Sequence, residues 1–337
     1  MESVNRFHLA KRLAFLLILI LAIVIPLSLG GYLTSILILI SIWSMVALSL
    51  NLVFGYTGQL SLGQSAFVGT GAYSLGLLTV KVGMGFWPAF ALAVIISGVF
   101  GLAIGFPALR AKGPYFVLVT LGFAVIVGVV VLAWAELTGG ANGLPGVPRP
   151  DSIPLPWGRK FDFESDLHMY YLILFFLVVI TGIIRSLVNS LVGKTFLAIS
   201  HDENLAESVG INAASRKVLS FTISAIIAGI AGALYASYNR VISPDIAYFT
   251  KSMDALVFLI VGGVQTMAGP YLGTLVMFAV PEVLQVVPEL NTLLHGVILM
   301  IFVIFLPSGM VGGFSRLSFA IGRLWDTNRK NRTRRKV

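Results

Sequence analysis

The chain has 337 residues, of which 57% are hydrophobic and only 11% are charged, with a mean hydropathy of +0.94. Soluble domains carry about 25% charged residues, so this composition excludes a single soluble core and makes lipid part of the solvent. The chain has no cysteine, which excludes disulfides, thiol nucleophiles and thiolate metal sites.

Long apolar runs follow one another with short connections. Each is close to the roughly 20 residues that a helix needs to cross about 30 Å of hydrocarbon. The runs are 13–29, 33–53, 86–109, 114–134, 169–184, 218–238, 271–287 and 293–306. Residues 60–80, rich in Gly, Ser and Gln, are a further candidate, and 253–263 is short for a span. We predict an all-α integral membrane protein, a polytopic bundle of nine or ten transmembrane helices.

The basic residues behind the net charge of +9 are distributed unevenly between the two sides of the predicted bundle, and this pattern indicates its orientation. If the N-terminus is cytoplasmic, 17 of the 23 Lys and Arg residues fall on the cytoplasmic side, as the positive-inside rule requires. This predicts a cytoplasmic N-terminus (1–12), a transmembrane domain (13–307) and a basic cytoplasmic tail (308–337). The first 30 residues also resemble a signal peptide, but their long apolar run favours an uncleaved first helix. No recognisable nucleic-acid-reading module accompanies the basic charge.

Small residues in the apolar runs predict close helix packing. Ser61, Ser65 and Gly69 recur every four residues, which predicts one helix face. Gly101 and Gly105 form a second small-residue pair of the kind that lets helices approach closely in lipid.

The longest extracytoplasmic connection is predicted at 135–168. Its Gly-rich stretch Thr138–Gly146 and the four prolines that follow favour turns over helix. Two interpretations remain open. The segment is either a solvated connection or a cap that docks a partner, since loops longer than about 15 residues are often functional.

A polar segment on the cytoplasmic side, 191–217, interrupts the apolar runs. Ser200 and Glu203 have the spacing of a capping box, which predicts that a short amphipathic helix begins there. Gly210 is a natural helix end, and Asn212 is placed to cap the next helix. The helix of about two turns is either an ordinary interfacial helix or a docking element for a cytoplasmic partner.

No group of residues predicts bond-making chemistry. Gly193-Lys194-Thr195 resembles the end of a phosphate-binding loop, but Val188 stands where that motif requires glycine. None of the four histidines has metal-ligand spacing within a span. We therefore predict that the chain is not an enzyme and binds no cofactor or metal of its own.

Several stretches together resemble the LivM-type permeases of branched-chain amino-acid ABC importers. The first is Leu50–Phe67, LNLVFGYTGQLSLGQSAF, and the others are Gly113–Phe123, the Thr138–Gly146 loop, Gly193–Asn212 and a region from Ser243 to Glu282. Their order and spacing also agree, and the similarity covers about residues 30 to 310.

The resemblance implies a type II ABC importer permease-like fold in the plasma (inner) membrane. It implies four kinds of partner: a second homologous permease subunit, two cytoplasmic ATPases that hold ATP and Mg, an extracytoplasmic substrate-binding protein, and the lipid bilayer. In such permeases the polar segment is the coupling helix that docks into the ATPase. Carried over to this chain, it assigns coupling to Ser200, His201, Asp202, Glu203, Leu205, Glu207 and Gly210. Ser200-His201 departs from the commonest family pattern, which has Arg there.

Alternating access needs a path, and uncharged polar residues in the spans suit a zwitterion that binds weakly. The candidates are Asn51, Ser61, Gln64, Ser65 and Thr120. Glu282, which follows Pro281 in a span, is a candidate because ionisable groups in membranes are often functional. For all six, the alternative is structural: hydrogen bonds to neighbouring helices, or an interfacial position for Glu282.

Two other functions remain open at this stage. A urea or short-amide ABC permease would have a similar pattern, and the substrate is not encoded in readable form. A secondary transporter driven by an ion gradient would need paired acids or broken helices near the midplane, and Glu282 is the one candidate acid.

Overall fold

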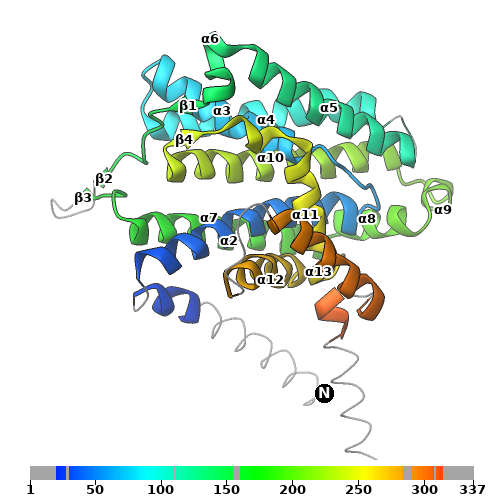
Figure 1. The fold of residues 1–337 in the computed structure, drawn as a ribbon. Coiled ribbons are helices and arrows are strands. Elements are labelled where there is room, and N and C mark those ends of the chain that lie inside the picture. Colours follow the sequence, from blue (N-terminus) through cyan, green and yellow to red (C-terminus); the bar gives the residue numbers. More distant parts are fainter. Residues whose placement is uncertain are drawn as a thin grey trace, which may run out of the picture.

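The protein is described from a computed structural model. It describes residues 20–27, 30–109, 111, 113–154, 160–283, 290–306 and 309–313, and helices dominate it (Figure 1). The predicted N-terminus 1–12 and most of the tail 308–337 lie outside the described residues, so both remain predictions.

A helical segment at 20–27 precedes the labelled elements. The helices are α2 (Gly31–Leu50), η1 (Asn51–Gly55), α3 (Gln64–Gly76), η2 (Leu77–Lys81), α4 (Phe86–Ala108), α5 (Pro114–Ala133), α6 (Ala135–Thr138), η3 (Gly140–Asn142), α7 (Asp166–Asn189), α8 (Leu191–His201), α9 (Glu203–Ser208), α10 (Ala213–Asn239), η4 (Pro244–Ala247), α11 (Phe249–Gly262), α12 (Gly269–Val283) and α13 (Asn291–Phe305). The strands are β1 (Leu144–Pro145), β2 (Ile153–Pro154), β3 (Lys160–Phe161) and β4 (Val241–Ile242), in the antiparallel pairs β1–β4 and β2–β3.

Five helices in the described part are long and apolar enough to cross a membrane. They are α2 continued by η1, then α4, α5, α7 and α10, and they match five of the predicted runs. The run 60–80 is instead divided between a short non-helical stretch, α3 and η2, and the later runs give the shorter helices α11, α12 and α13. An all-helical membrane bundle is therefore confirmed, whereas the count of nine or ten crossings stays a prediction.

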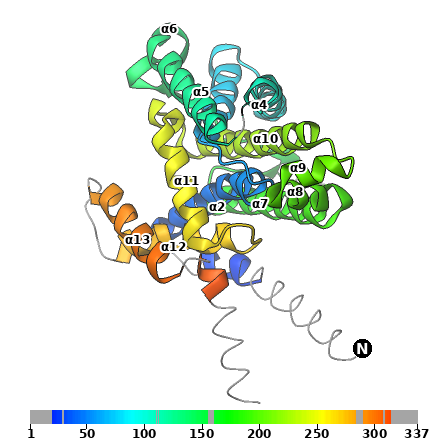
Figure 2. The same cartoon turned by 90° about the vertical axis from the view of Figure 1, so that its right-hand side faces the viewer.

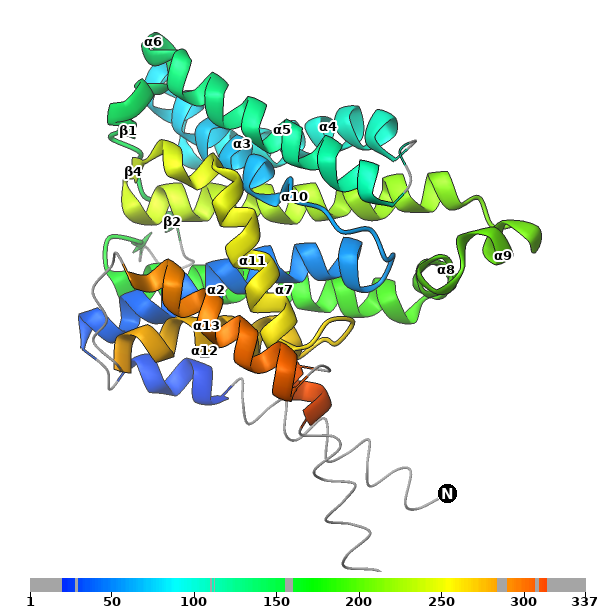
Figure 3. The same ribbon diagram turned by 45° about the vertical axis from the view of Figure 1, so that its right-hand side comes forward.

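The bundle has two distinct ends, which Figure 3 shows at its left and right. We call the end that carries α6, β1 and β4 the loop end, and the end that carries α8 and α9 the coupling end. Helices α12 and α13 lie on the opposite side of α2 from α4 and α5 (Figure 2).

An ion pair and hydrogen bonds hold the described part of the connection predicted at 135–168 against the helices at the loop end. Arg149 forms a 2.6 Å ion pair with Asp166 at the start of α7. The Oδ2 atom of Asp151 accepts a 2.8 Å hydrogen bond from the Phe86 amide at the start of α4. The Ser237 hydroxyl of α10 donates to the Pro148 carbonyl at 3.0 Å. The described residues of the connection, 135–154 and 160–165, thus lie as a surface over the helix ends.

Helix α10 is central, because it packs against α2, α3 and α4. Gly71 of α3 faces the backbone of Gly229 so closely that an added Cβ would overlap the Gly229 carbonyl. Gly101 and Gly105 of α4 face the side chains of Ala225 and Phe221 of α10, which an added Cβ would overlap. This confirms the predicted Gly101–Gly105 packing face. Because lipid supplies little hydrophobic force between helices, such close approach is a main source of cohesion.

We expect Gly71→Ala to lower the free energy of unfolding by about 1–3 kcal/mol, because the new methyl group forces the α3 and α10 backbones apart. The control is Gly182→Ala, at an exposed α7 position with open space around it, where alanine adds at most about 1 kcal/mol of helix propensity. Thermal unfolding in detergent micelles checks both, and an equal melting temperature for the two variants would contradict the packing argument.

Candidate functional site

The chain between η1 and α3 is a non-helical segment, residues 56–63, that we call the interrupted segment. The structure contradicts the predicted helix face at Ser61, Ser65 and Gly69, because α3 begins only at Gln64 and Ser61 lies before it. Gly58 has a φ of +71°, which glycine adopts readily. Ser61, Gln64 and Ser65 are all buried. Non-helical backbone at membrane depth is tolerated only where protein groups satisfy it.

Side chains from three elements satisfy the interrupted segment and the first turn of α3. The Leu62 amide donates to Oγ1 of Thr120 on α5 at 3.1 Å, and the Gly63 amide donates to the Ser61 hydroxyl at 3.2 Å. The Ser65 amide donates to the Ser252 hydroxyl of α11 at 2.8 Å. Two residues predicted for the path, Thr120 and Ser61, therefore supply hydrogen-bond acceptors to the non-helical backbone, and a third, Ser65, has its own amide satisfied by Ser252.

Gln64 closes a second polar network inside the bundle. Its Oε1 accepts from the Ser49 hydroxyl of α2 at 3.2 Å, and its Nε2 donates to the Ser224 hydroxyl of α10 at 2.9 Å. The Ser224 hydroxyl in turn donates to the Ser49 carbonyl at 2.7 Å. All three side chains are buried, so the network joins α2, α3 and α10 through hydrogen bonds that hold their relative positions.

Asn51, the first residue of η1, holds a second irregular connection. Its Oδ1 accepts from the Gln265 amide at 2.9 Å, and its Nδ2 donates to the Thr266 carbonyl at 2.8 Å. Gln265 lies between α11 and α12 with a φ of +63°. One buried amide therefore satisfies a donor and an acceptor of the connection.

Glu282 lies apart from the other path candidates. Both of its carboxylate oxygens accept from the Tyr32 hydroxyl, at 2.8 and 2.9 Å. Tyr32 is exposed at the start of α2, so the contact joins the end of α12 to the start of α2 at the edge of the bundle.

The predicted capping box at Ser200 is wrong. Helix α8 continues through His201, and the Ser200 hydroxyl donates back to the Leu197 carbonyl at 2.9 Å. Asp202 is the actual N-cap of α9, since its Oδ1 accepts from the Leu205 amide at 3.0 Å. The extended backbone of Asp202 separates the two helices, and its carboxylate also suits the positive helix end.

The later signals in the polar segment were predicted correctly. Gly210 has a φ of +88° after α9, and the Asn212 side chain accepts from the Ser215 amide at 2.9 Å as the cap of α10. The predicted short helix is therefore α9, with six residues, next to the longer α8.

The acidic residues of α9 have different surroundings. Glu203 pairs with Lys217 of α10, with 2.6 Å between Oε2 and Nζ, and the Lys217 side chain is only 3% exposed. Glu207 is exposed, and so are the apolar Leu205 and Val209, at 63% and 72%. No local signal in the sequence indicates this pair, because Lys217, near the start of α10, lies fourteen residues after Glu203.

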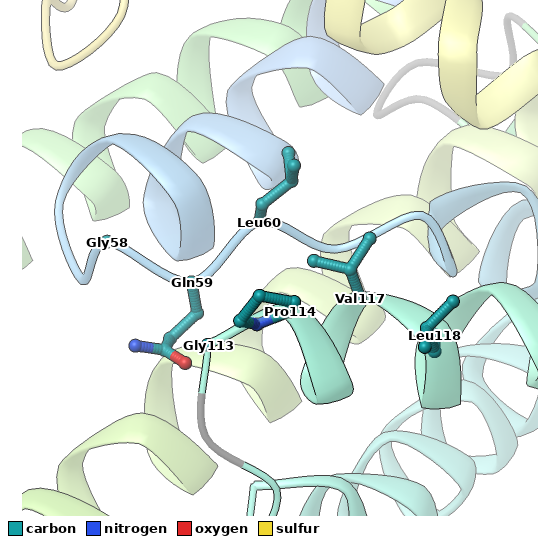
Figure 4. Close-up of a pocket in the computed structure, with 7 residues that line it drawn as sticks. All are labelled: Gly58, Gln59, Leu60, Gly113, Pro114, Val117 and Leu118. Carbon is teal, nitrogen blue, oxygen red and sulfur yellow. The ribbon is translucent and has the colours of Figure 1, made fainter.

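The coupling end touches the interrupted segment directly. Gly58 lies against Ser200 of α8, so closely that an added Cβ would come within 3.2 Å of the Ser200 Cα. Beside it, a pocket of about 520 Å³ separates Gly58–Leu60 from the start of α5 (Figure 4). Gly113, Pro114, Val117 and Leu118 form its other side.

Comparison with known proteins identifies the architecture. A family model described as branched-chain amino acid transport system / permease component matches residues 32–304. The chain belongs to this family. It is a transport permease subunit, a multi-pass membrane protein and not an enzyme.

Named relatives agree with the family match. The permease is 30% identical over 328 residues to the high-affinity branched-chain amino acid transport system permease protein LivM of Salmonella typhimurium, covering 92% of this chain and 77% of the relative. It is 23% identical over 290 residues to LivH of Escherichia coli, covering 81% and 92%. A probable LivM of Methanocaldococcus jannaschii is 22% identical, covering 82% and 92%. No solved structure matches the chain significantly.

In the described part of the permease, no group of three His, Cys, Asp or Glu residues could hold a metal ion. The polar residues gathered near the interrupted segment are hydroxyls and amides, which suit hydrogen bonding to uncharged backbone and to small polar solutes.

We expect Thr120→Val to destabilise the permease by about 1–3 kcal/mol, because it leaves the buried Leu62 amide without an acceptor. Thr120→Ser keeps the hydroxyl and should cost less. Thr222→Val is the matched control, because the Thr222 hydroxyl donates only to the Val218 carbonyl of its own helix. Thermal unfolding measures all three, and equal effects of Thr120→Val and Thr222→Val would exclude this role for Thr120.

Proposed function

We propose that this permease is the membrane-spanning subunit of an ABC importer that moves branched-chain amino acids, or similar small zwitterions, inward by alternating access. The family match over residues 32–304 carries the proposal. ATP and Mg bind to two partner ATPases, and an extracytoplasmic binding protein delivers the substrate. The similarity to both LivM and LivH supports a second, homologous permease subunit as partner.

The polar segment is the docking site for the ATPases. In support, Leu205 of α9 and Val209, directly after it, are strongly exposed apolar side chains next to the exposed Glu207. Burying a leucine or valine stabilises a contact by about 1.5–3 kcal/mol. If the ATPases dock there, the coupling end and both termini lie in the cytoplasm, and the loop end lies outside as the surface for the binding protein.

Alternating access would change the contacts of the polar residues around the interrupted segment. Asn51, Ser61, Gln64, Ser65 and Thr120 are hydrogen-bonded in this conformation. We propose that a second conformation exposes part of this set to the path, since a broken helix can rearrange by exchanging a few side-chain bonds. Glu282 lies at the edge of the bundle, apart from this set, and would contact the solute where it enters the path.

Replacing both Leu205 and Val209 with Ser should prevent co-purification of the ATPase subunits and abolish substrate-stimulated ATP hydrolysis by the reconstituted complex. The reason is the lost apolar contact, because the exposed side chains contribute little to the fold of the permease itself. Val82→Ser, at an equally exposed position of the loop end, is the control and should leave co-purification of the ATPases unchanged. Normal assembly of the double variant would show that the ATPases dock elsewhere.

The ion pair between Glu203 and Lys217 should hold α9 against α10. Glu203→Gln leaves a buried ammonium unpaired, which should cost about 3–5 kcal/mol, whereas Glu203→Gln with Lys217→Met should recover most of that stability. If the ion pair also transmits movement of α9 to α10, the double variant should stay stable but import less substrate per ATP hydrolysed. A double variant with the same import per ATP as the unmodified complex would show that the pair has only a structural role. Glu207→Gln, on the same helix, is the matched control.

A further inference from the structure

The segment η4 enters the bundle at the loop end. An added Cβ on Gly69 of α3 would overlap Ala247, and one on Gly128 of α5 would touch the Tyr248 ring. The chain from Ser243 to Tyr248 therefore lies between α3 and α5, and α11 begins directly after it at Phe249.

Two buried polar atoms at this place lack a hydrogen-bond partner among the described residues: the Tyr73 hydroxyl and Oδ1 of Asp245. Tyr73 is only 5% exposed. It lies one helical turn beyond Gly69, on the α3 face that touches Ala247, and Asp245 precedes Ala247 by two residues. The carboxylate interacts electrostatically with both Tyr73 and Tyr235 of α10, and Tyr73 also interacts with Tyr248. Asp245 therefore lies near two phenol groups, those of Tyr73 and Tyr235, and Tyr248 lies near Tyr73.

Asp245 has no basic partner in the described part of the chain, where the ion pairs involve other acids. A buried carboxylate normally has a paired charge or several hydrogen bonds. A buried phenol hydroxyl normally has a partner as well. Two buried polar atoms without partners in the same part of the structure indicate a binding site. The ligand would supply hydrogen-bond donors and a positive charge.

We propose that Asp245, Tyr73 and Tyr235 bind the ammonium group of the transported solute where it enters the permease from the loop end. An ammonium group has three N–H donors and no acceptor, which matches one carboxylate and neighbouring phenol oxygens. Aromatic faces add cation–π attraction. A divalent metal fits poorly, because it takes several carboxylate, carbonyl or water oxygens and the cluster has one carboxylate.

The assignment rests on the proposed function for the identity of the solute, and the binding chemistry can be tested without transport. The full-length chain is reconstituted in lipid nanodiscs, and its melting temperature is followed with three probes of similar apolar shape. Leucine carries both charges, 3-methylbutylamine carries only the ammonium, and 4-methylpentanoate carries only the carboxylate. Leucine and the amine should raise the melting temperature, and 4-methylpentanoate should not.

Asp245→Asn should abolish both rises. Glu136→Gln, which removes an exposed carboxylate at the same end of the bundle, should leave them unchanged. Stabilisation of the unmodified chain by 4-methylpentanoate and not by the amine would overturn the proposal, as would no stabilisation by either ammonium probe.

Tyr73→Phe separates a binding role from a structural one. Because the hydroxyl has no described partner, its removal should leave the melting temperature of the ligand-free chain unchanged or raise it, while the amine stabilises the variant less. A lower melting temperature of the ligand-free variant, with an unchanged response to the amine, would mean that bridging water satisfies the two atoms and would overturn the proposal.

In proteoliposomes that contain the complete importer, Asp245→Asn should raise the KM for leucine uptake by about 10- to 100-fold, the loss expected for one hydrogen-bonded charge. An unchanged KM would refute the ammonium site and leave the importer function intact. If the unmodified complex shows no ATP-dependent uptake, the proposed function fails, and the nanodisc measurements still decide whether the site binds ammonium.

Discussion

The rest of the structure depends on one constraint: the backbone of the interrupted segment must find hydrogen-bond partners where water is scarce. A continuous helix meets this need by itself, but residues 56–63 do not form one. Thr120 of α5 supplies an acceptor to Leu62 in this segment, and Ser252 of α11 supplies one to Ser65 in the adjoining first turn of α3. These bonds fix α5 and α11 relative to α3. Breaking a helix inside a bundle therefore makes neighbouring helices mutually dependent, because each supplies groups that another lacks.

This dependence explains why separate stretches of the sequence carry the family resemblance together. Leu50–Phe67 contains the interrupted segment, and Gly113–Phe123 supplies Thr120. The region from Ser243 to Glu282 supplies Ser252 and the connection held by Asn51. The polar segment meets Gly58 through Ser200, and the Thr138–Gly146 loop pairs with β4 through β1. Stretches that are distant in the sequence are thus parts of one contact system.

The sequence predicted what depends on local composition and missed what depends on distant partners. Apolar runs located the five long spans, and Gly210 and Asn212 marked local backbone geometry correctly. The start of α3 at Gln64 was missed, because the polar composition of 60–80 does not reveal that Thr120 supports a non-helical chain there. Ser200 and Asp202 are both good caps, and only the fold decides between them. The six path candidates were recognised as polar residues in spans, but their partners, among them Ser49, Ser224 and Tyr32, come from other helices.

The contact between Gly58 and α8 has a mechanical consequence. Because Gly58 has no side chain, the backbone of α8 at Ser200 rests almost directly on the backbone of the interrupted segment. Side chains between two elements can absorb a small displacement by changing rotamer, whereas two backbones in contact cannot. A shift of α8 toward the bundle should therefore displace the backbone of residues 58–63 as well. The contact would couple movement at the coupling end directly to the interior of the bundle.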